Sequence, residues 1–403
     1  MDAYVARQPI FDRHKNIYAY ELLFRDGTAN FAPGIDGDVA TNTVLANSIL
    51  NIGMDIIAGG KKSFINFTRN LLVNKVPLLL SKENIVVEIL EDVKAEEEVI
   101  AACQEMVQKG FIIALDDFEY DEELEPLIDL ADIIKFDFRL STLEEIKAYI
   151  QQLKGKDLRL LAEKIETLEE FNLALDMGFE LFQGYFFCKP EIMKGKKIPS
   201  SQIAQLQIMA EINKPDYDFS ELGTLISRDV GISYKLLHYI NSPFFAKPSK
   251  ISVIKQALVY MGGAELRRFM SLMTMTKLAE GKPHELISLS CIRGKFCELL
   301  GKESKYQLKV AELFTVGMFS LIDAIVDQPM AKVMEKLPLS EDLVTALVDK
   351  KGLLAGFLML VIAYEQGRWQ STTKIARRLG IDETAIPGLY REACQWSNSI
   401  SNM

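Results

Sequence analysis

The sequence predicts two domains of different fold class: an α/β domain built as a TIM-like (β/α) barrel over residues 1–190, and an all-α domain over residues 201–403. In the first part, short apolar runs alternate with amphipathic helical stretches. Most of these runs are continuous, as in strands that are buried on both faces of a parallel sheet. After Pro190 helical periodicity dominates, and prolines interrupt the pattern where helices should end.

The apolar runs of the first part are the strand candidates. They are IYAYELLF (17–24), KSFINF (62–67), NIVVEIL (84–90), FIIALDD (111–117), ADIIKFD (131–137), LRLLAEKI (158–165) and LFQGYFF (181–187). Residues 3–10 supply a further candidate, and helical stretches such as 95–109 and 143–153 lie between the strands. About eight repeated βα units predict a barrel, with a doubly wound open sheet as the alternative.

The second part follows a polar, lysine-rich stretch at residues 191–200, which we interpret as a linker. The expected helices cover residues 202–213, 219–228, 232–239, 253–261, 264–277, 285–300, 305–325, 372–379 and 384–399. We find no strand of comparable strength and no internal repeat in this part, so we expect it to be entirely helical.

Composition argues against several classes of protein. The net charge of −10 disfavours non-specific binding to nucleic acid or anionic lipid, because such binding depends on clustered Lys and Arg. Five cysteines without CxxC spacing and three histidines predict neither a disulfide framework nor a zinc site. The N-terminus does not resemble a signal peptide, and the longest apolar stretch, 357–364, falls far short of the ~20 residues that span a bilayer. We therefore expect a cytoplasmic protein that binds neither nucleic acid nor a membrane.

Polar side chains stand in or directly after the apolar strand candidates of the first part. Burying acidic groups in a sheet is costly unless they are paired or bind a cation. In a parallel barrel the carboxyl ends of all strands open onto one face, so these side chains are expected to converge there. The residues are Glu21, Asn66, Glu88, Asp116, Asp117, Lys135, Glu163 and Gln183.

Carboxylate and amide oxygens in such a ring are hard ligands of the kind that Mg²⁺ and Mn²⁺ prefer. Two such ions could clamp a phosphodiester and lower the pKa of an attacking water, while Lys135 offsets charge on the phosphate. The alternative is that some of these residues are satisfied core groups or helix caps. For Asp117, which could cap the following helix, both interpretations remain open.

The same residues lie in a series of short motifs that occur in one order along the chain. The motifs are Gln8-Pro9-Ile10, Glu21-Leu22-Leu23-Phe24-Arg25, Phe64-Ile65-Asn66, Glu88-Ile89-Leu90-Glu91, Leu115-Asp116-Asp117-Phe118, Ile134-Lys135-Phe136-Asp137, Ala162-Glu163-Lys164-Ile165-Glu166-Thr167 and Gln183-Gly184-Tyr185. In this order they resemble the EAL family, whose members hydrolyse cyclic-di-GMP to the linear dinucleotide with two divalent ions. The resemblance spans nearly all of residues 1–190.

The resemblance implies a role for each matching position. Arg25 would contact a phosphate of cyclic-di-GMP, and Lys135 and Gln183 would complete the site. Glu163 would help to position metal and water as the candidate general base. The implied ligands of the Mg²⁺ or Mn²⁺ ions are Glu21, Asn66, Glu88, Asp116 and, shared between the two ions, Asp117.

This sequence also departs from the family pattern around the site. The family continues Asp-Asp-Phe-Gly with Thr-Gly-Tyr-Ser-Ser, a loop that organises the metal site and the active dimer. Here residues 118–123 read FEYDEE, so a glycine that permits positive φ is lost. Leu90 replaces a threonine, Lys164 replaces a glycine, and Glu91 loses the loop that it steadies in the family. Because ligands without their supporting contacts lose activity, we expect weak or absent phosphodiesterase activity.

The helical part resembles HDOD domains, relatives of HD phosphohydrolases that lack the catalytic His-Asp pair. The matching segments are LISRDV (225–230), LLHYINSP (236–243), ISVIKQAL (251–258) and MGG (261–263). Where an HD enzyme has His-Asp, residues 317–321 read GMFSL, so we expect no hydrolysis by this domain. We interpret Asn241 and Ser242 as a helix-end cap and turn rather than as a catalytic pair.

Three hypotheses for the function follow, in order of preference. The first is a signalling protein whose barrel binds or slowly hydrolyses cyclic-di-GMP and whose HDOD-like domain relays this state to an unidentified signalling protein. The second is a non-enzymatic protein-interaction adaptor that no longer recognises the nucleotide. The third is a fully competent phosphodiesterase with an altered loop. The sequence leaves open whether two copies associate as a homodimer.

Overall fold

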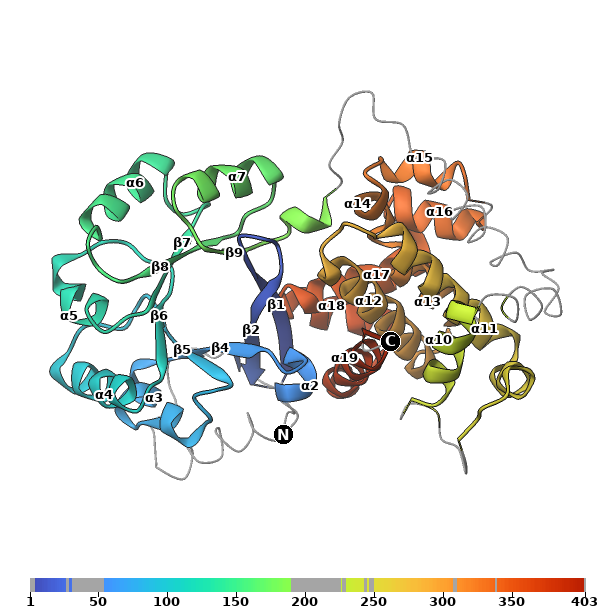
Figure 1. Cartoon of the computed structure of the whole chain (residues 1–403), viewed down its shortest axis with the longest axis horizontal. Coiled ribbons are helices and arrows are strands. Elements are labelled where there is room, and N and C mark those ends of the chain that lie inside the picture. Colours follow the sequence, from blue (N-terminus) through green and yellow to red (C-terminus); the bar gives the residue numbers. More distant parts are fainter. Residues whose placement is uncertain are drawn as a thin grey trace. The chain divides into compact units, whose positions relative to one another are not determined.

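The computed structural model describes residues 4–26, 29–30, 54–189, 226, 230–242, 245, 250–306, 310–337 and 339–401. The chain divides into two compact units, Met1–Phe187 with Glu365–Gly367, and Cys188–Tyr364 with Arg368–Met403. The first unit is an α/β barrel and the second is helical, which confirms the predicted fold class (Figure 1). The predicted linker at 191–200 lies outside the described residues, so the domain limits stay a prediction.

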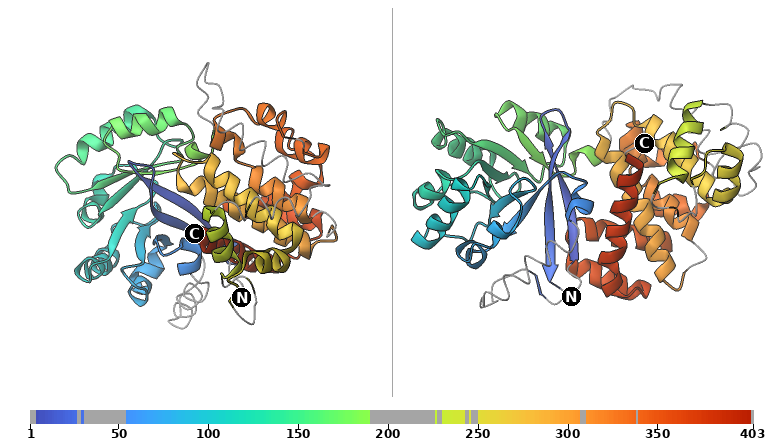
Figure 2. Two further views of the ribbon diagram at one scale, coloured as in Figure 1. Left: turned by 45° about the vertical axis from the view of Figure 1, so that its right-hand side comes forward. Right: turned by 60° about the horizontal axis from the view of Figure 1, so that its bottom comes forward.

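Strands of the first unit close into a barrel (Figures 1 and 2). The order around the barrel is β1-β9-β8-β7-β6-β5-β4-β2, and the pairing of β1 with β2 closes it, while the short β3 extends the far end of β2. The strands are β1 (Tyr4–Asp12), β2 (Ile17–Asp26), β3 (Ala29–Asn30), β4 (Lys62–Phe67), β5 (Ile85–Ile89), β6 (Ile112–Leu115), β7 (Ile133–Asp137), β8 (Arg159–Glu163) and β9 (Leu181–Gln183). The doubly wound alternative is therefore wrong.

Strand β1 differs from the purely parallel arrangement that repeated βα units predict. It pairs antiparallel with both β2 and β9, whereas β2 and β4 to β9 pair parallel in succession. Only four residues separate β1 from β2, enough for a hairpin but too few for the crossover that a parallel pair needs. Asp12 fixes this turn, since its Oδ1 accepts hydrogen bonds from the backbone N–H groups of His14 and Asn16 at 2.8 and 2.9 Å.

Helices of the first unit lie around the outside of the barrel (Figure 1). Polar side chains cap the N-termini of α6 and α7. Thr142 and Glu145 form a capping box on α6, and Thr167 caps α7. The helices are α2 (Met54–Ala58), α3 (Arg69–Val73), η1 (Val76–Leu79), α4 (Glu97–Gln108), η2 (Glu122–Leu124), α5 (Glu125–Ile128), α6 (Leu143–Gln152), α7 (Leu168–Asp176) and η3 (Phe186–Cys188).

One apolar layer fills the interior of the barrel. Each barrel strand contributes one buried side chain to this layer, so the layer fills the cross-section of the barrel. The members are Ile10, Ala19, Phe64, Val86, Ala114, Ile133, Leu161 and Leu181. This layer sets the inward-facing register of all eight strands.

The second unit is built from helices (Figure 2). They are α10 (Val230–Ile240), α11 (Ile254–Leu278), α12 (His284–Glu303), α13 (Val310–Phe319), α14 (Ile322–Val326), α15 (Met330–Met334), α16 (Glu341–Val348), α17 (Gly352–Glu365), α18 (Trp369–Leu379), η5 (Glu383–Ala385) and α19 (Ile386–Ser401). Of the helices described, none combines the length and the apolar character that crossing a membrane requires.

Helix boundaries in this unit depart from the sequence expectation in two places. The helices expected at 253–261 and 264–277 run together as α11, which bends at Gly262 (φ 71°). The helix expected at 305–325 is instead divided into α13 and α14, because Ser320 Oγ caps the Gly317 carbonyl at 2.7 Å and Leu321 leaves the helical conformation. The helices expected at 202–213 and 219–228 lie outside the described residues, apart from Ile226.

Helix α12 is the buried centre of the helical unit and packs against α13 and α19. Its contact with α13 depends on small residues at the crossing point. A Cβ on Gly317 would lie 2.3 Å from the carbonyl oxygen of Arg293, and one on Gly294 would lie 3.1 Å from that of Phe314. The two backbones therefore approach more closely than any side chain at these positions would allow.

We predict that Gly317→Ala lowers the free energy of unfolding of the helical unit by about 1–3 kcal/mol, because the added methyl group overpacks the α12–α13 crossing. Gly388→Ala is the matched control, since a Cβ at this position in α19 would meet nothing within 4 Å. It should be neutral or stabilise by up to ~1 kcal/mol through helix propensity. Urea unfolding followed by circular dichroism measures both changes, and equal stability of the two variants would contradict the close crossing.

Candidate metal centre

The candidate site residues form a second layer of the barrel interior, next to the apolar layer. Successive side chains of a strand point to opposite faces, so the residue two positions from an inward-facing residue also points inward. On the parallel strands the polar residue follows its apolar partner by two, and on the antiparallel β1 it precedes it by two. The pairs are Ile10 and Gln8, Ala19 and Glu21, Phe64 and Asn66, Val86 and Glu88, Ala114 and Asp116, Ile133 and Lys135, Leu161 and Glu163, and Leu181 and Gln183.

Lys135 on β7 is the cation of this polar layer, and its side chain is only 1% exposed. Its ammonium lies 2.7 Å from Asp116 Oδ1, 2.7 Å from Glu163 Oε1 and 3.9 Å from Glu21 Oε2, and it donates a hydrogen bond to Glu88 Oε1. Carboxylates from four strands or strand ends therefore converge on one ammonium group. The structure thus brings these residues together at one end of the barrel.

Side-chain amides complete the layer around Glu21. Asn66 Nδ2 donates to Glu21 Oε1 at 3.1 Å, and Gln183 Nε2 donates to Glu21 Oε2 at 2.6 Å. Gln183 Nε2 also donates to Gln8 Oε1 at 3.1 Å, so β1 contributes to the layer as well. The sequence assigns Gln8 no role, because its place in the layer follows from the antiparallel direction of β1, which puts the residue two positions before Ile10 at this end of the barrel.

Two backbone features hold the rim of the layer. The backbone N–H of Asp116 still donates to the Ile89 carbonyl of the neighbouring strand. Asp117, which follows it, has φ 38°, a left-handed conformation that Asp tolerates better than most residues. Gly184 follows Gln183 with φ 143°, and a Cβ there would lie 2.1 Å from the carbonyl oxygen of Ile165. Only glycine fits at 184, so the chain turns away from β9 directly after Gln183.

Electrostatics of the layer are dominated by burial and by an excess of negative charge. Burial raises the pKa of Glu88 well above its usual value against the pull of Lys135, and burial raises the pKa of Glu163 to about 8. For Asp116 burial is outweighed by the charge and hydrogen bond of Lys135, which lower its pKa. Burial and the neighbouring Asp116 raise the pKa of Asp117. Without a further cation, part of this cluster therefore retains protons at neutral pH.

The residues present fit divalent metal ions. Oxygens of Glu21, Glu88 and Glu163 lie within 4.8 Å of one another, and so do oxygens of Asp116, Asp117 and Glu163. Four buried oxygens of the layer and its rim have no hydrogen-bond partner: Asn66 Oδ1, Glu88 Oε2, Asp117 Oδ1 and Gln183 Oε1. Buried oxygens without a partner are costly, and a hard cation such as Mg²⁺ or Mn²⁺ would satisfy them.

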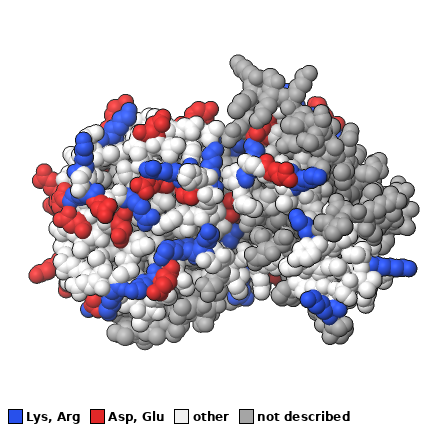
Figure 3. All heavy atoms as spheres, in the orientation of Figure 1, with Lys and Arg blue, Asp and Glu red and all other residues white. Residues whose placement is uncertain are grey.

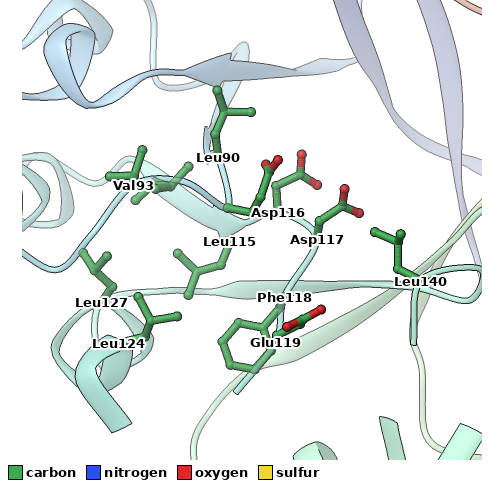
Figure 4. A pocket seen from close by; sticks show the side chains of 12 residues that line it. Leu90, Val93, Leu115, Asp116, Asp117, Phe118, Glu119, Leu124, Leu127 and Leu140 are labelled. Carbon is green, nitrogen blue, oxygen red and sulfur yellow. The ribbon is translucent and has the colours of Figure 1, made fainter. Parts of the chain in front are cut away.

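A pocket of about 300 Å³ adjoins the second of these carboxylate groups (Figure 4). Asp116 and Asp117 stand at one edge of it, and Leu124 and Leu127 lie on the opposite side. Leu90, Val93, Leu115, Phe118 and Leu140 supply further apolar lining, with Glu91 and Glu119 as additional carboxylates. The pocket thus places an apolar surface directly beside candidate metal ligands.

For two residues that the sequence linked to the site, the structure gives no contact with the polar layer among the side chains that it describes. Arg25 lies in β2, but its side chain is outside what the structure describes. Glu91 is exposed, and within the described part of the chain its side chain makes no hydrogen bond or ion pair.

The described part of the helical unit offers no comparable grouping. Among the residues described, the clusters of His, Cys, Asp and Glu that could hold a metal all lie in the barrel. Asn241 ends α10, where its Nδ2 donates to the carbonyls of Leu237 and Ile251 at 2.7 and 2.6 Å, and its Oδ1 accepts from the Ile251 N–H at 2.9 Å. These contacts are those of a residue that ends a helix and anchors the following segment.

Comparisons with known proteins agree with this arrangement. An EAL domain model matches residues 46–190, and an HDOD domain model matches residues 198–337. The chain is 36% identical to the "Cyclic di-GMP phosphodiesterase CdgJ" of Vibrio cholerae, over 99% of this chain and 93% of that protein. It is 34% identical to the "Uncharacterized protein YuxH" of Bacillus subtilis, over 99% of both chains.

Among solved structures, the barrel is similar to BlrP1 of Klebsiella pneumoniae, solved as calcium and manganese complexes with cyclic-di-GMP. The identity is 19%, the match covers 46% of this chain and 55% of that one, and the TM-scores are 0.39 and 0.38. At such scores this likeness adds nothing to the assignment. The family follows from the full-length identity to CdgJ and YuxH and from the two domain matches. This chain belongs to the family of proteins that join an EAL domain to an HDOD domain.

Proposed function

We propose that this protein is a cyclic-di-GMP signalling protein whose barrel binds the dinucleotide through divalent metal ions and hydrolyses it slowly or not at all. The observation that carries this proposal is the buried layer of carboxylates around Lys135, with four buried oxygens in the layer and at its rim that lack a hydrogen-bond partner. A layer of this kind suits a ligand that brings negative phosphates and cations together. The name of the relative CdgJ supports cyclic-di-GMP as that ligand.

The residues of the layer have different proposed roles in binding. Glu21, Asn66, Glu88, Asp116 and Asp117 are the proposed ligands of Mg²⁺ or Mn²⁺ ions, which would neutralise a bound phosphodiester and acidify a water molecule. Lys135 holds the carboxylates at fixed positions and offsets their mutual repulsion.

Glu163 and Gln183 are proposed to act beside these metal ligands. Burial raises the pKa of Glu163 to about 8, which suits a group that accepts and returns a proton near neutral pH. Gln183 orients Glu21 by donating to its Oε2. Arg25 is proposed as a phosphate contact from its position in the EAL motif.

The adjoining pocket suits one base of the dinucleotide. Its volume of about 300 Å³ is at the lower end of small-ligand sites, and its walls are mainly apolar. A base stacked on these walls would leave its phosphate near Asp116 and Asp117, where the metal ions are proposed to lie.

Weak hydrolysis follows from the loop after Asp117. Phe118 is buried against the rings of Phe136 and Tyr149, and residues 118–123 supply no side-chain hydrogen bond to the candidate metal ligands in the described structure. Asp121 then caps η2 instead of supporting a ligand. Loss of supporting contacts around metal ligands typically costs 10–100-fold in affinity or activity. CdgJ, named as a phosphodiesterase, favours full hydrolysis as the second candidate function.

The proposed function also includes the protein's partners and its location in the cell. We propose that the HDOD domain relays the state of the barrel to a signalling protein and does no chemistry, since the described helical unit holds no metal-ligand cluster. Acidic and basic side chains are interspersed over the barrel on the face shown in Figure 3, which does not suit nucleic acid. A cytoplasmic location and a homodimer stay predictions.

We predict that the full-length protein binds cyclic-di-GMP in Ca²⁺ or Mg²⁺ and that Glu21→Ala and Arg25→Ala each weaken this binding roughly tenfold or more. Isothermal titration calorimetry measures the change. Glu144→Ala, which removes an exposed carboxylate from α6, is the matched control and should bind like the wild type. No binding by the wild type at high micromolar ligand would leave only the adaptor function.

We further predict turnover of cyclic-di-GMP in Mn²⁺ that is slow compared with the typical enzymatic rate of about 10 per second. Chromatographic separation of the linear product from the substrate measures it. Rapid turnover that Glu163→Gln abolishes would show that the loop of residues 118–123 supports catalysis after all, and the second candidate function would stand.

Stability offers an independent test of the layer. Lys135→Met should lower the free energy of unfolding by about 3–5 kcal/mol in EDTA, because it leaves buried carboxylates without their cation. Excess Mn²⁺ should restore part of this loss by binding the folded state. Lys147→Met, on the exposed side of α6, should change stability by no more than ~0.5 kcal/mol. Urea unfolding that shows the same loss with and without Mn²⁺ would argue against metal binding.

A further inference from the structure

Lys164 holds an unusual position directly beside the candidate metal centre. It follows Glu163 at the end of β8 and has φ 56°, a left-handed conformation that a lysine rarely adopts. A glycine would take this conformation without strain. Lys15, Lys75 and Lys350 share this conformation, so what distinguishes Lys164 is its position beside Glu163.

The ammonium group of Lys164 is anchored at the rim. It forms an ion pair with Asp137 Oδ2, and the Asp137 side chain is only 2% exposed. The other oxygen of Asp137 accepts hydrogen bonds from the backbone N–H groups of Arg139 and Leu140 at 2.6 and 3.3 Å. Asp137 is thus fixed by the backbone and fixes the ammonium in turn.

The charge of Lys164 acts on one of the two carboxylate groups in particular. It interacts electrostatically with Asp117 and Glu163, which belong to the group of Asp116, Asp117 and Glu163. Glu21 and Glu88, which form the other group with Glu163, are not among its main electrostatic partners. The group of Asp116, Asp117 and Glu163, which we call the outer group, therefore has the ammonium of Lys164 beside it, in addition to the buried Lys135 that both groups share. The carboxylate of Asp137 also acts on Asp117, with the opposite sign and more weakly than Lys164.

A fixed cation repels a second cation. Since the Lys164 side chain is 53% exposed, solvent screens part of this repulsion, so the effect on a divalent ion should be moderate. The ammonium also partly satisfies the negative charge of Asp117, which reduces the gain from a metal ion there.

We propose that Lys164 is a built-in cation that weakens divalent-metal binding at the outer group of Asp116, Asp117 and Glu163, so that the site holds one divalent ion tightly and a second only weakly. This inference rests on the proposed function, because it concerns the same centre. It also accounts for slow hydrolysis, since a reaction that uses two metal ions would proceed with the outer position mostly empty.

Titration of the full chain with Mn²⁺, followed by the electron paramagnetic resonance signal of the free ion, counts the ions bound and their affinities. The wild type should bind one ion tightly and a second at least roughly tenfold more weakly. Lys164→Gln and Lys164→Gly should each tighten the second site roughly tenfold, while Lys164→Arg, which keeps the charge, should leave it weak.

Lys75 provides the matched control. It has nearly the same backbone conformation, φ 57°, but its ammonium pairs with Glu105 on α4. Lys75→Gln and Lys75→Gly therefore change the same charge and the same strain without touching the centre, and both should bind Mn²⁺ like the wild type. These variants separate a local effect of Lys164 from a change in net charge or backbone strain.

The outcomes distinguish this inference from the proposed function. Two ions bound with equal affinity by the wild type, or a second site unchanged in Lys164→Gln, would overturn the role of Lys164 and leave the metal centre standing. The absence of any bound Mn²⁺ in all variants would overturn both. Tightening in Lys164→Gln and Lys75→Gln alike would show a general effect of net charge and would also overturn the inference.

Discussion

The rest of the barrel depends on the burial of several carboxylates around the single ammonium group of Lys135. Removing charges from water costs several kcal/mol per ion unless partners compensate for it. Lys135 compensates for only part, because it faces Glu21, Glu88, Asp116 and Glu163 at once. The layer is therefore stable without metal only because some of its carboxyl groups hold protons, and it is predisposed to exchange those protons for metal ions.

The apolar layer below makes this arrangement possible. Eight buried side chains, one from each barrel strand, fix the strands in register, and the pleat then directs every second residue into the polar layer. The polar residues need no long loops to position them, because the same strands that build the core carry them. The backbone at Asp117 and Gly184 only ends the strands at the required points.

Much of this could be predicted from the sequence, and the reasons are physical. Continuous apolar runs followed by acidic residues indicated parallel strands with a polar rim, and Glu88, Lys135 and Glu163 do lie together there. The direction of β1 and the place of Gln8 do not follow from the sequence, since in a parallel strand the residue two positions after Ile10, and not the one two positions before it, would lie in the polar layer. The bend of α11 at Gly262 and the division between α13 and α14 depend on single backbone conformations, which periodicity does not reveal. The position of Lys164 relative to Asp117 and Asp137 depends on the backbone conformation at the ends of neighbouring strands. It is therefore seen only in the structure.

If metal ions replace protons in this layer, calorimetry of Mn²⁺ binding at pH 7 in two buffers of different ionisation enthalpy will detect the protons that are released. Burial raises the pKa of Glu163 to about 8, and burial likewise raises the pKa of Glu88, so metal binding should release protons into the buffer. We expect the observed heat to change with the buffer by an amount that corresponds to about one proton or more per chain. The same heat in both buffers, or no heat of binding at all, would contradict this account of the barrel.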